Sequence, residues 1–239
     1  MSGLYLKGAF VQFMPTFLVP LPNVILFQYN PETMTHTWKP ASPEVSPDSR
    51  IKPNPLAVES LPGESFNFTL MMDSNDTIAD GNAVTSGLAE GTGLYSRLSA
   101  LEMLLYPSGS FTSNQLLGKV SSAISSALTG SSATTKTAVP QYMMPTVLFV
   151  WGPGRIVPVR VTGLTITEKL YDSLLLNPIH AEATVDIQVL TPEEVTALRD
   201  SMKKVAVAAY VYSQAFRQAM ALANLSYAAS SIMGLLPFG

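Results

Sequence analysis

Two segments of the chain alternate apolar and polar residues with a period of two, which is typical of a strand with one face in the core. The first segment is residues 64–73, and its apolar face consists of Phe66, Phe68, Leu70 and Met72. The second is residues 179–190, and its apolar face consists of Ala181, Ala183, Val185, Ile187 and Val189. We therefore predict a half-buried strand over each segment.

Five further strands are predicted from apolar, β-rich or alternating segments. They cover residues 4–13, 24–29, 33–38, 146–151 and 155–170. Asn30-Pro31 separates the second from the third, because proline cannot donate to a ladder and restricts the residue before it. We interpret residues 24–38 as a hairpin whose second strand has a polar threonine face.

Two more features refine the predicted strands. Gly152-Pro153-Gly154 predicts a turn between the strands at 146–151 and 155–170. Pro158 predicts a bulge or an edge position, because a proline inside a sheet removes a ladder hydrogen bond.

Helical spacing occurs in two places. Leucines recur at steps of three and four in residues 94–105, which predicts one amphipathic helix. Thr191 followed by Pro192 and two glutamates predicts the start of a second helix. Its apolar positions follow a heptad seam, made of Val195, Leu198, Met202, Val205, Ala209, Tyr212, Phe216, Ala219 and Ala223. Such a helix needs a partner surface, either on its own domain or on another chain.

The other segments lack periodicity and are interpreted as connections. Residues 14–23, 40–63 and 73–93 are predicted to be loops, and the Ser/Thr-rich residues 107–141 an insertion that holds at most a small helix at 114–128. We therefore divide the chain into a β domain at 1–190 and a C-terminal helical extension at 191–239. Because loops join the sequence-adjacent strands, the fold class is mainly β (α+β), as an antiparallel barrel or sandwich with one flanking helix.

Composition changes this picture in one respect, which is the surface. Only 13% of the residues are charged although 47% are hydrophobic, well under the usual charged quarter of a soluble chain. We infer that much of the surface is buried against other chains; the alternative is a secreted β-protein with a neutral Ser/Thr-rich coat. The net charge of −3 without a basic block argues against nucleic acid as a partner.

Targeting signals and catalytic motifs are not evident. Residues 1–26 have no continuous apolar core, so we expect no signal peptide, and no run of about 18 apolar residues predicts a membrane span. The chain has no cysteine, and its histidines, His36 and His180, have no second ligand nearby in the sequence. Glycine-rich nucleotide-binding and hydrolase motifs are missing. We predict no enzymatic activity, no catalytic residues, no metal site and no cofactor.

Four blocks of the sequence, taken in order, resemble the tube-protein-like domain of contractile injection systems, the phage-tail-like particles of bacteria. The blocks are VILFQYNPETMTHTW at 24–38, LPGESFNFTLMMD at 61–73, PTVLFVWG at 145–152 and the strand pair at 157–190. The similarity covers roughly residues 4–190 and is nearest to the baseplate tube-initiator or adaptor branch. Many adaptors continue into a lysin-motif domain, whereas this chain has the heptad helix at 191–226.

The resemblance implies a small antiparallel β-barrel of the tail-tube type that assembles as a homo-hexameric ring. It implies structural roles for Phe27, Asn30, Pro31 and Trp38 in the hairpin and for Trp151 and Gly152 at a later strand end. Tube, spike-hub and baseplate proteins would be the other partners. Assembly would occur in the bacterial cytoplasm, within a particle that is either released or associated with the envelope.

The expected function is therefore a structural ring at the baseplate that joins the spike hub to the inner tube. The C-terminal helix is a candidate assembly element, through Val195, Leu198, Met202, Val205, Tyr212 and Phe216. An ordinary inner-tube subunit is the first alternative, although the insertion and the long helix argue against it. A secreted carbohydrate-binding β-sandwich, and a hydrolase on a β-barrel, are the others.

Overall fold

A computed structural model gives the fold of the chain. It describes residues 6–14, 21–41, 58, 60–79, 83–106, 144, 146–197 and 202–235. Most of the predicted loop at 40–63, and the whole insertion at 107–141 with its candidate helix, lie outside the described residues.

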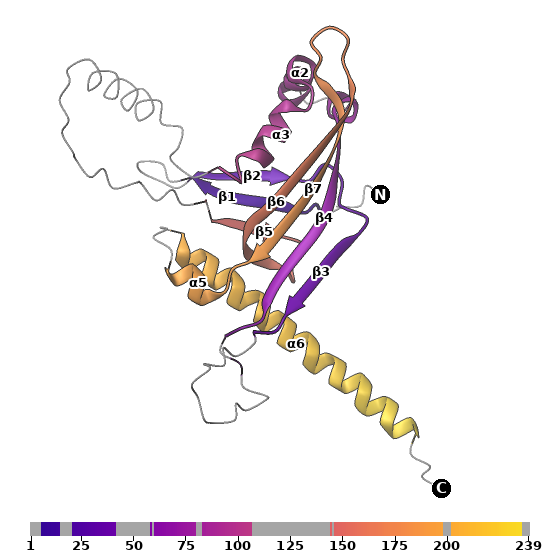
Figure 1. Cartoon of the computed structure of the whole chain (residues 1–239). Coiled ribbons are helices and arrows are strands. Elements are labelled where there is room, and N and C mark those ends of the chain that lie inside the picture. Colours follow the sequence, from indigo (N-terminus) through magenta and orange to yellow (C-terminus); the bar gives the residue numbers. More distant parts are fainter. Residues whose placement is uncertain are drawn as a thin grey trace, which may run out of the picture.

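Seven strands form one antiparallel sheet (Figure 1). They are β1 (Ala9–Met14), β2 (Leu21–Leu26), β3 (Met34–Lys39), β4 (Gly63–Asp73), β5 (Val147–Val150), β6 (Ile156–Tyr171) and β7 (Pro178–Val189). Their order across the sheet is β2-β1-β5-β6-β7-β4-β3. The predicted class, mainly β in an α+β chain, is confirmed, but the sheet is not closed into a barrel.

The predicted hairpin at 24–38 is wrong. β2 pairs with β1 and β3 pairs with β4, so the two strands lie at opposite edges of the sheet. Residues 27–33 lead from one edge to the other and include Phe27, Gln28 and Tyr29, which were expected to be strand. Asn30-Pro31 does interrupt the strands as predicted. It belongs to a connection between the two edges of the sheet, because β2 pairs with β1 and β3 pairs with β4.

The sheet curls around an aromatic core. The ring centroid of Phe10 in β1 lies 6.2 Å from that of Phe68 in β4, although three strands separate β1 from β4. Phe149 of β5 lies 5.5 Å from Phe68. Each fully buried side chain of this size stabilises the fold by about 1.5–3 kcal/mol, so the curl itself is held by these rings. The two alternating segments, β4 and β7, bury their apolar faces in this core as predicted.

Pro158 lies inside the sheet and is buried, not at an edge or a bulge. It pairs with Leu148, and its carbonyl accepts a hydrogen bond from the backbone N–H of Leu190. Because the N–H and C=O of a strand residue point the same way, the missing N–H of Pro158 faces the place where β7 has ended. The register shift occurs instead between Val161 and Gly163.

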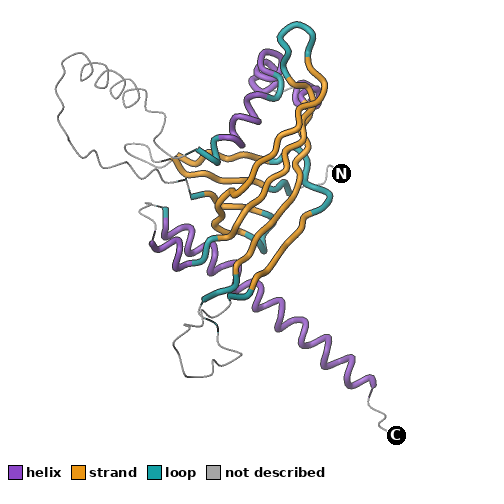
Figure 2. Tube along the Cα trace, in the orientation of Figure 1, coloured by secondary structure: helices purple, strands orange, loops and turns teal. Residues whose placement is uncertain are grey.

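Helices lie at both ends of the sheet (Figure 2). At one end are α1 (Ser74–Ala79), α2 (Ala83–Thr92) and α3 (Tyr95–Glu102). α3 confirms the predicted amphipathic helix, with Leu98 and Leu101 buried. The loop predicted at 73–93 is wrong, because Asp73 caps α1 through a hydrogen bond from the N–H of Asn75 to its Oδ1 (2.8 Å). Asp73, one of the residues that suggested a turn, serves here as the helix cap.

At the other end lie α5 (Pro192–Ala197) and α6 (Lys203–Leu235). The predicted cap is confirmed, because the N–H of Thr191 donates to Glu194 (2.8 Å) and the N–H of Glu194 donates to the Thr191 hydroxyl (3.3 Å). The predicted seam, however, is not the most buried row of α6. The buried positions of α6 are Ala206, Tyr210 and Ser213, one residue out of phase with the predicted Val205, Ala209 and Tyr212.

Candidate functional site

Three of the six residues expected to form a structural signature, Phe27, Asn30 and Trp151, meet at the start of β1, around Gly8. The N–H of Gly8 donates to Oδ1 of Asn30 and its carbonyl accepts from the N–H of Phe27, both at 2.9 Å. A Cβ on Gly8 would lie 2.7 Å from ring atoms of both Phe27 and Trp151. Only glycine fits this position. The contacts with Phe27, Asn30 and Trp151 hold the start of β1 against the connection between β2 and β3 and against the end of β5.

The remaining signature residues do not join this cluster. Pro31 lines the groove described below, and Gly152 adopts φ +71 in the turn after β5, a conformation that favours glycine. Trp38 is 41% exposed near the end of β3 and stacks against Arg217 of α6, whose guanidinium carbon lies 4.8 Å from the centre of the Trp38 ring.

Trp38 borders a buried charged cluster that joins α6 to the sheet. The Glu64 side chain is only 2% exposed and receives two hydrogen bonds from the guanidinium of Arg217, at 2.9 and 2.5 Å. Its Oε1 also lies 2.8 Å from Nε2 of His36. Arg155 packs its guanidinium over the ring of Phe66, at 5.1 Å, on the same side of the sheet.

Burial shifts the pKa values of two side chains in this cluster, His36 and Arg155. It lowers the pKa of His36 below the ordinary value, against the opposing effect of the Glu64 carboxylate. Burial likewise lowers the pKa of the Arg155 guanidinium, with the positive charge of Arg217 acting in the same direction. The attachment point for α6 thus consists of a neutral His36, the Glu64 carboxylate and the guanidinium groups of Arg155 and Arg217. The sequence did not indicate this cluster, because Glu64 and Arg217 are 153 residues apart.

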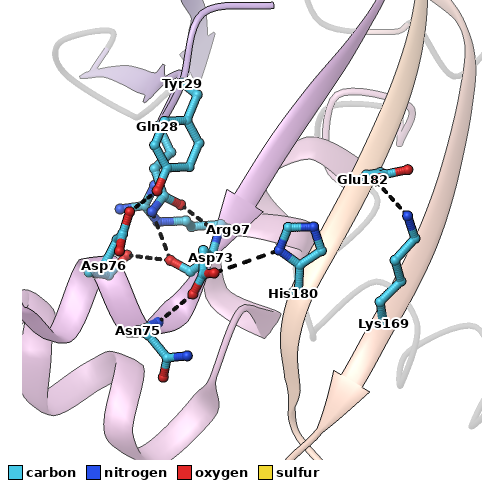
Figure 3. A network of polar contacts seen from close by, with 10 residues as sticks. Gln28, Tyr29, Asp73, Asn75, Asp76, Arg97, Lys169, His180 and Glu182 are labelled. Atoms are coloured by element: carbon cyan, nitrogen blue, oxygen red, sulfur yellow. Dashed lines mark hydrogen bonds and ion pairs between the residues drawn. The ribbon is translucent and has the colours of Figure 1, made fainter.

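A polar groove of about 880 Å³ opens on the outer face of β4 and β7 beside the edge-to-edge connection. Figure 3 shows its network: the Gln28 side chain donates to the carbonyl of Asp73 (2.7 Å) and accepts from its N–H (3.0 Å). Nδ1 of His180 lies 3.7 Å from Oδ2 of Asp73. These contacts tie the connection to the end of β4.

Two titratable side chains of the groove, Tyr29 and Glu182, have shifted pKa values. A hydrogen bond from the Tyr29 hydroxyl to Asp76 raises the pKa of Tyr29 to about 12. The ammonium of Lys169, 2.5 Å from Glu182, lowers the pKa of that carboxyl. Neither shift provides a general base or a nucleophile near neutral pH, and among the described residues no three acidic or histidine side chains are grouped to hold a metal ion.

The candidate assembly residues differ in how exposed their side chains are. Val195 is fully buried between α5 and the sheet, whereas Val205, Tyr212 and Phe216 of α6 are exposed. Tyr212 donates its hydroxyl to the carbonyl of Pro153 (2.8 Å), which holds the middle of α6 on the β5–β6 turn. Met202 precedes α6 and is half-buried, and Leu198 lies outside the described residues.

An apolar surface that was not predicted lies at the tip of the long β6–β7 hairpin. Leu174, Leu175 and Leu176 are exposed there, Leu174 to 84%. Asp172 orders the tip by accepting hydrogen bonds from the N–H groups of Leu174 and Leu175. The signal was present in the sequence as three consecutive leucines between Asp172-Ser173 and Asn177-Pro178.

The chain was compared with known proteins. No model of a protein family matches it, and no curated protein is recognisably similar in sequence. No helix among the described residues is both long and apolar enough to cross a membrane.

Proposed function

We propose that this chain is a structural subunit of a bacterial contractile injection system, in a ring at the baseplate that joins the spike hub to the inner tube. The resemblance of its four sequence blocks to tube-protein-like domains supplies the class of particle. The proposal includes the tail-tube type of barrel for the curled sheet, a hexameric ring and no enzymatic activity.

One observation carries the proposal: two apolar elements project from the body (Figure 1). The first is the β6–β7 hairpin tip, where Leu174 is 84% exposed. The second is the part of α6 after Arg217, where Leu222 is 69% exposed. Apolar surfaces of this kind mark protein–protein contacts, and two of them at opposite ends suit a subunit with neighbours on several sides.

The groove supports the same function. Two pairs at or beside it, Lys169–Glu182 and Tyr29–Asp76, are joined by hydrogen bonds. Such pairs position the chain segments that they join.

The proposal predicts a ring in solution or on its spike hub. The test is the mass of the purified full chain by sedimentation or light scattering, with negative-stain images of the same sample. We expect particles of about six copies with a central hole, as the resemblance implies. Rings that stack into tubes unaided would favour the ordinary tube subunit, and a monomer that also fails to join purified spike hub would contradict the proposal.

A further inference from the structure

β2 is the last strand on one side of the sheet, and its outer edge is open. On its inner side it pairs with β1, and just past β2 the N–H of Phe27 donates to the carbonyl of Gly8 (2.9 Å). Hydrogen-bonded and non-hydrogen-bonded pairs alternate along an antiparallel ladder, so in this register Val24 and Leu26 turn their N–H and C=O groups away from β1. Within the part of the chain that the structure describes, no strand pairs with these groups.

The open part of this edge is short and has a defined end. Pro22 is the next residue of β2 whose backbone faces outward, and it has no N–H to donate. Proline at such a position is typical of an edge strand, because it prevents another strand from pairing along the whole edge. An added strand would therefore be held at Val24 and Leu26 and would not continue past Pro22.

α3 turns the open edge into a groove. The helix lies beside β2 (Figure 1), and a groove of about 320 Å³, here called the β2–α3 groove, lies between the helix and the edge. α3 lines it with Ser96, Arg97 and Ala100, and β2 contributes Val24 and Leu26. The small side chains of α3 leave room for a strand, whose backbone would lie about 4.8 Å from that of β2.

Val24 and Leu26 also offer apolar contacts to a strand added there. Ile25 packs against the aromatic core, so its two neighbours point to the opposite face of β2. The side chains of Val24 and Leu26 are 51% and 60% exposed. Side chains that lie opposite each other on neighbouring strands make the contacts that stabilise a sheet. The added strand should therefore carry apolar, β-branched residues at the positions beside Val24 and Leu26.

The β2–α3 groove is positively charged, although the chain as a whole has a net charge of −3. Lys7 and Arg97 line it, and none of its described lining residues is acidic. Arg97 donates a hydrogen bond to the side chain of Gln28 (3.3 Å), which lies opposite Lys7 when the register of β1 and β2 is continued by two residues. Neither cation forms an ion pair within the described part of the chain. Both can therefore bind a carboxylate, to which an arginine can donate two hydrogen bonds.

We infer that the β2–α3 groove binds an extended acidic peptide segment of a partner protein, which joins the sheet as a strand beside β2. The backbone of the segment pairs with Val24 and Leu26, and a glutamate or aspartate further along it meets Lys7 and Arg97. Main-chain hydrogen bonds then provide affinity, and the side chains provide specificity. The inference goes beyond the proposed function and does not depend on it, because the groove fits such a segment in any assembly.

Peptide titration tests the inference on the full chain. The probe is a fluorescent peptide with blocked termini, made of alternating threonine and valine and ending in Glu-Val-Glu. The comparison peptide ends in Lys-Val-Lys. We expect the acidic peptide to bind at least about tenfold more tightly by fluorescence polarisation, with a difference that shrinks as salt is added. Hydrogen–deuterium exchange with mass spectrometry should show new protection of residues 21–28 when the acidic peptide binds.

N-methylated peptides separate strand pairing from attraction between charges alone. An extended strand turns the N–H groups of alternate residues toward the same neighbour, so methyl groups on one alternate set of amides block pairing on one side only. The acidic peptide methylated on one set should lose binding, and the peptide methylated on the other set should keep it. Equal affinity of the two methylated peptides would overturn the inference, as would equal affinity of the acidic and lysine peptides.

Substitutions in the chain test the two halves of the groove. Lys7→Gln combined with Arg97→Gln should weaken binding of the acidic peptide at least about tenfold. Arg160→Gln is the matched control, because it removes a positive charge on β6 that bonds to Gln188, and it should leave binding unchanged. Val24→Pro removes only an outward N–H, so it should lose peptide binding with little change in the urea midpoint.

Other results would assign the edge to a different occupant. Protection of residues 21–28 in the free chain at every concentration would place another segment on β2 and overturn the inference. Displacement of the peptide by a single-stranded oligonucleotide, without protection of β2, would indicate recognition of phosphate by the two cations and would also overturn it. Ring formation is measured without peptide, so this inference and the proposed function can each fail alone.

Discussion

At the residue scale, Glu64 determines how α6 is attached to the sheet. It is a nearly buried carboxylate whose hydrogen bonds come from Arg217 of α6 and His36 of β3. Removing one partner of such a pair leaves the other charge buried without compensation, which costs more than the intact pair contributes. The cluster therefore makes attachment of α6 sensitive to single substitutions and to pH.

Arg217→Met should lower the free energy of unfolding by about 3 kcal/mol, because it leaves the Glu64 carboxylate buried without its guanidinium. Urea denaturation followed by circular dichroism measures the change. Arg160→Met is the control, because Arg160 bonds only to Gln188 on the surface and its loss should cost under about 0.5 kcal/mol. Combining Arg217→Met with Glu64→Met should cost less than Arg217→Met alone; a larger cost would contradict the buried-charge explanation.

Lowering the pH should destabilise the folded chain through His36. Its pKa is lower in the folded state than the ordinary value of about 6.5, so the unfolded chain binds more protons and stability falls as the pH drops below that value. Glu64, Arg155 and Arg217 are the charged groups that act on it. His36→Gln should lose less stability than the natural chain between pH 7.5 and 5.5. Equal losses in urea denaturation would rule out this role.

At the element scale, the β6–β7 hairpin stores strain at an exposed apolar tip. Leu170 and Leu176 both have φ +56, a left-handed conformation that costs a residue with a Cβ about 1–2 kcal/mol. Neither leucine is buried in this chain, so packing within the chain does not offset the strain. Strained apolar residues at an exposed tip agree with the proposed contact between this hairpin and a neighbouring protein.

Leu176→Asn should therefore stabilise the isolated chain by about 0.5–1 kcal/mol, because asparagine tolerates the left-handed conformation. Thermal and urea unfolding measure this gain. Leu174→Asn is the matched control: its φ is not positive, and its stability should change by less than about 0.5 kcal/mol. A gain in both variants would indicate a general effect of polarity at the tip instead of relief of strain.

At the scale of the whole molecule, the chain combines an aromatic core with exposed apolar surfaces. Among the described residues, the core around Phe10, Phe68 and Phe149 includes none from α6 after Arg217. The large side chains of the hairpin tip and of residues 218–228 are exposed, so they contribute almost nothing to that core. Folding and assembly should therefore be separable.

A chain that ends after Arg217 should keep the stability of the full chain to within about 1 kcal/mol, because the side chains of residues 218–228 are exposed and bury little surface. It should lose self-association, measured by sedimentation beside the full chain at the same concentration. A truncated chain that assembles normally would contradict a role in assembly for α6 after Arg217, and one that unfolds would contradict the separation of folding from assembly.

The sequence by itself determined the elements whose physics is local. Alternation defined β4 and β7, leucine spacing defined α3, and Thr191 with Glu194 defined the start of α5. These assignments succeeded because burial of one face and satisfaction of helix-end groups depend on residues close in the chain. The same local rules wrongly predicted a loop at 73–93, because the helix cap Asp73 is also a residue typical of turns.

Only the tertiary structure decided which strands are neighbours and which side of α6 is buried. The sequence could not separate β2 from β3, because pairing depends on competing partners far along the chain. It also could not reveal the meeting of Glu64 with Arg217 or of Gly8 with Trp151, since only the packing of α6 and the pairing of β1 with β5 bring these distant residues together. The seam of α6 was misplaced by one residue because several faces of this helix are apolar, and the sheet selected the face carrying Ala206, Tyr210 and Ser213.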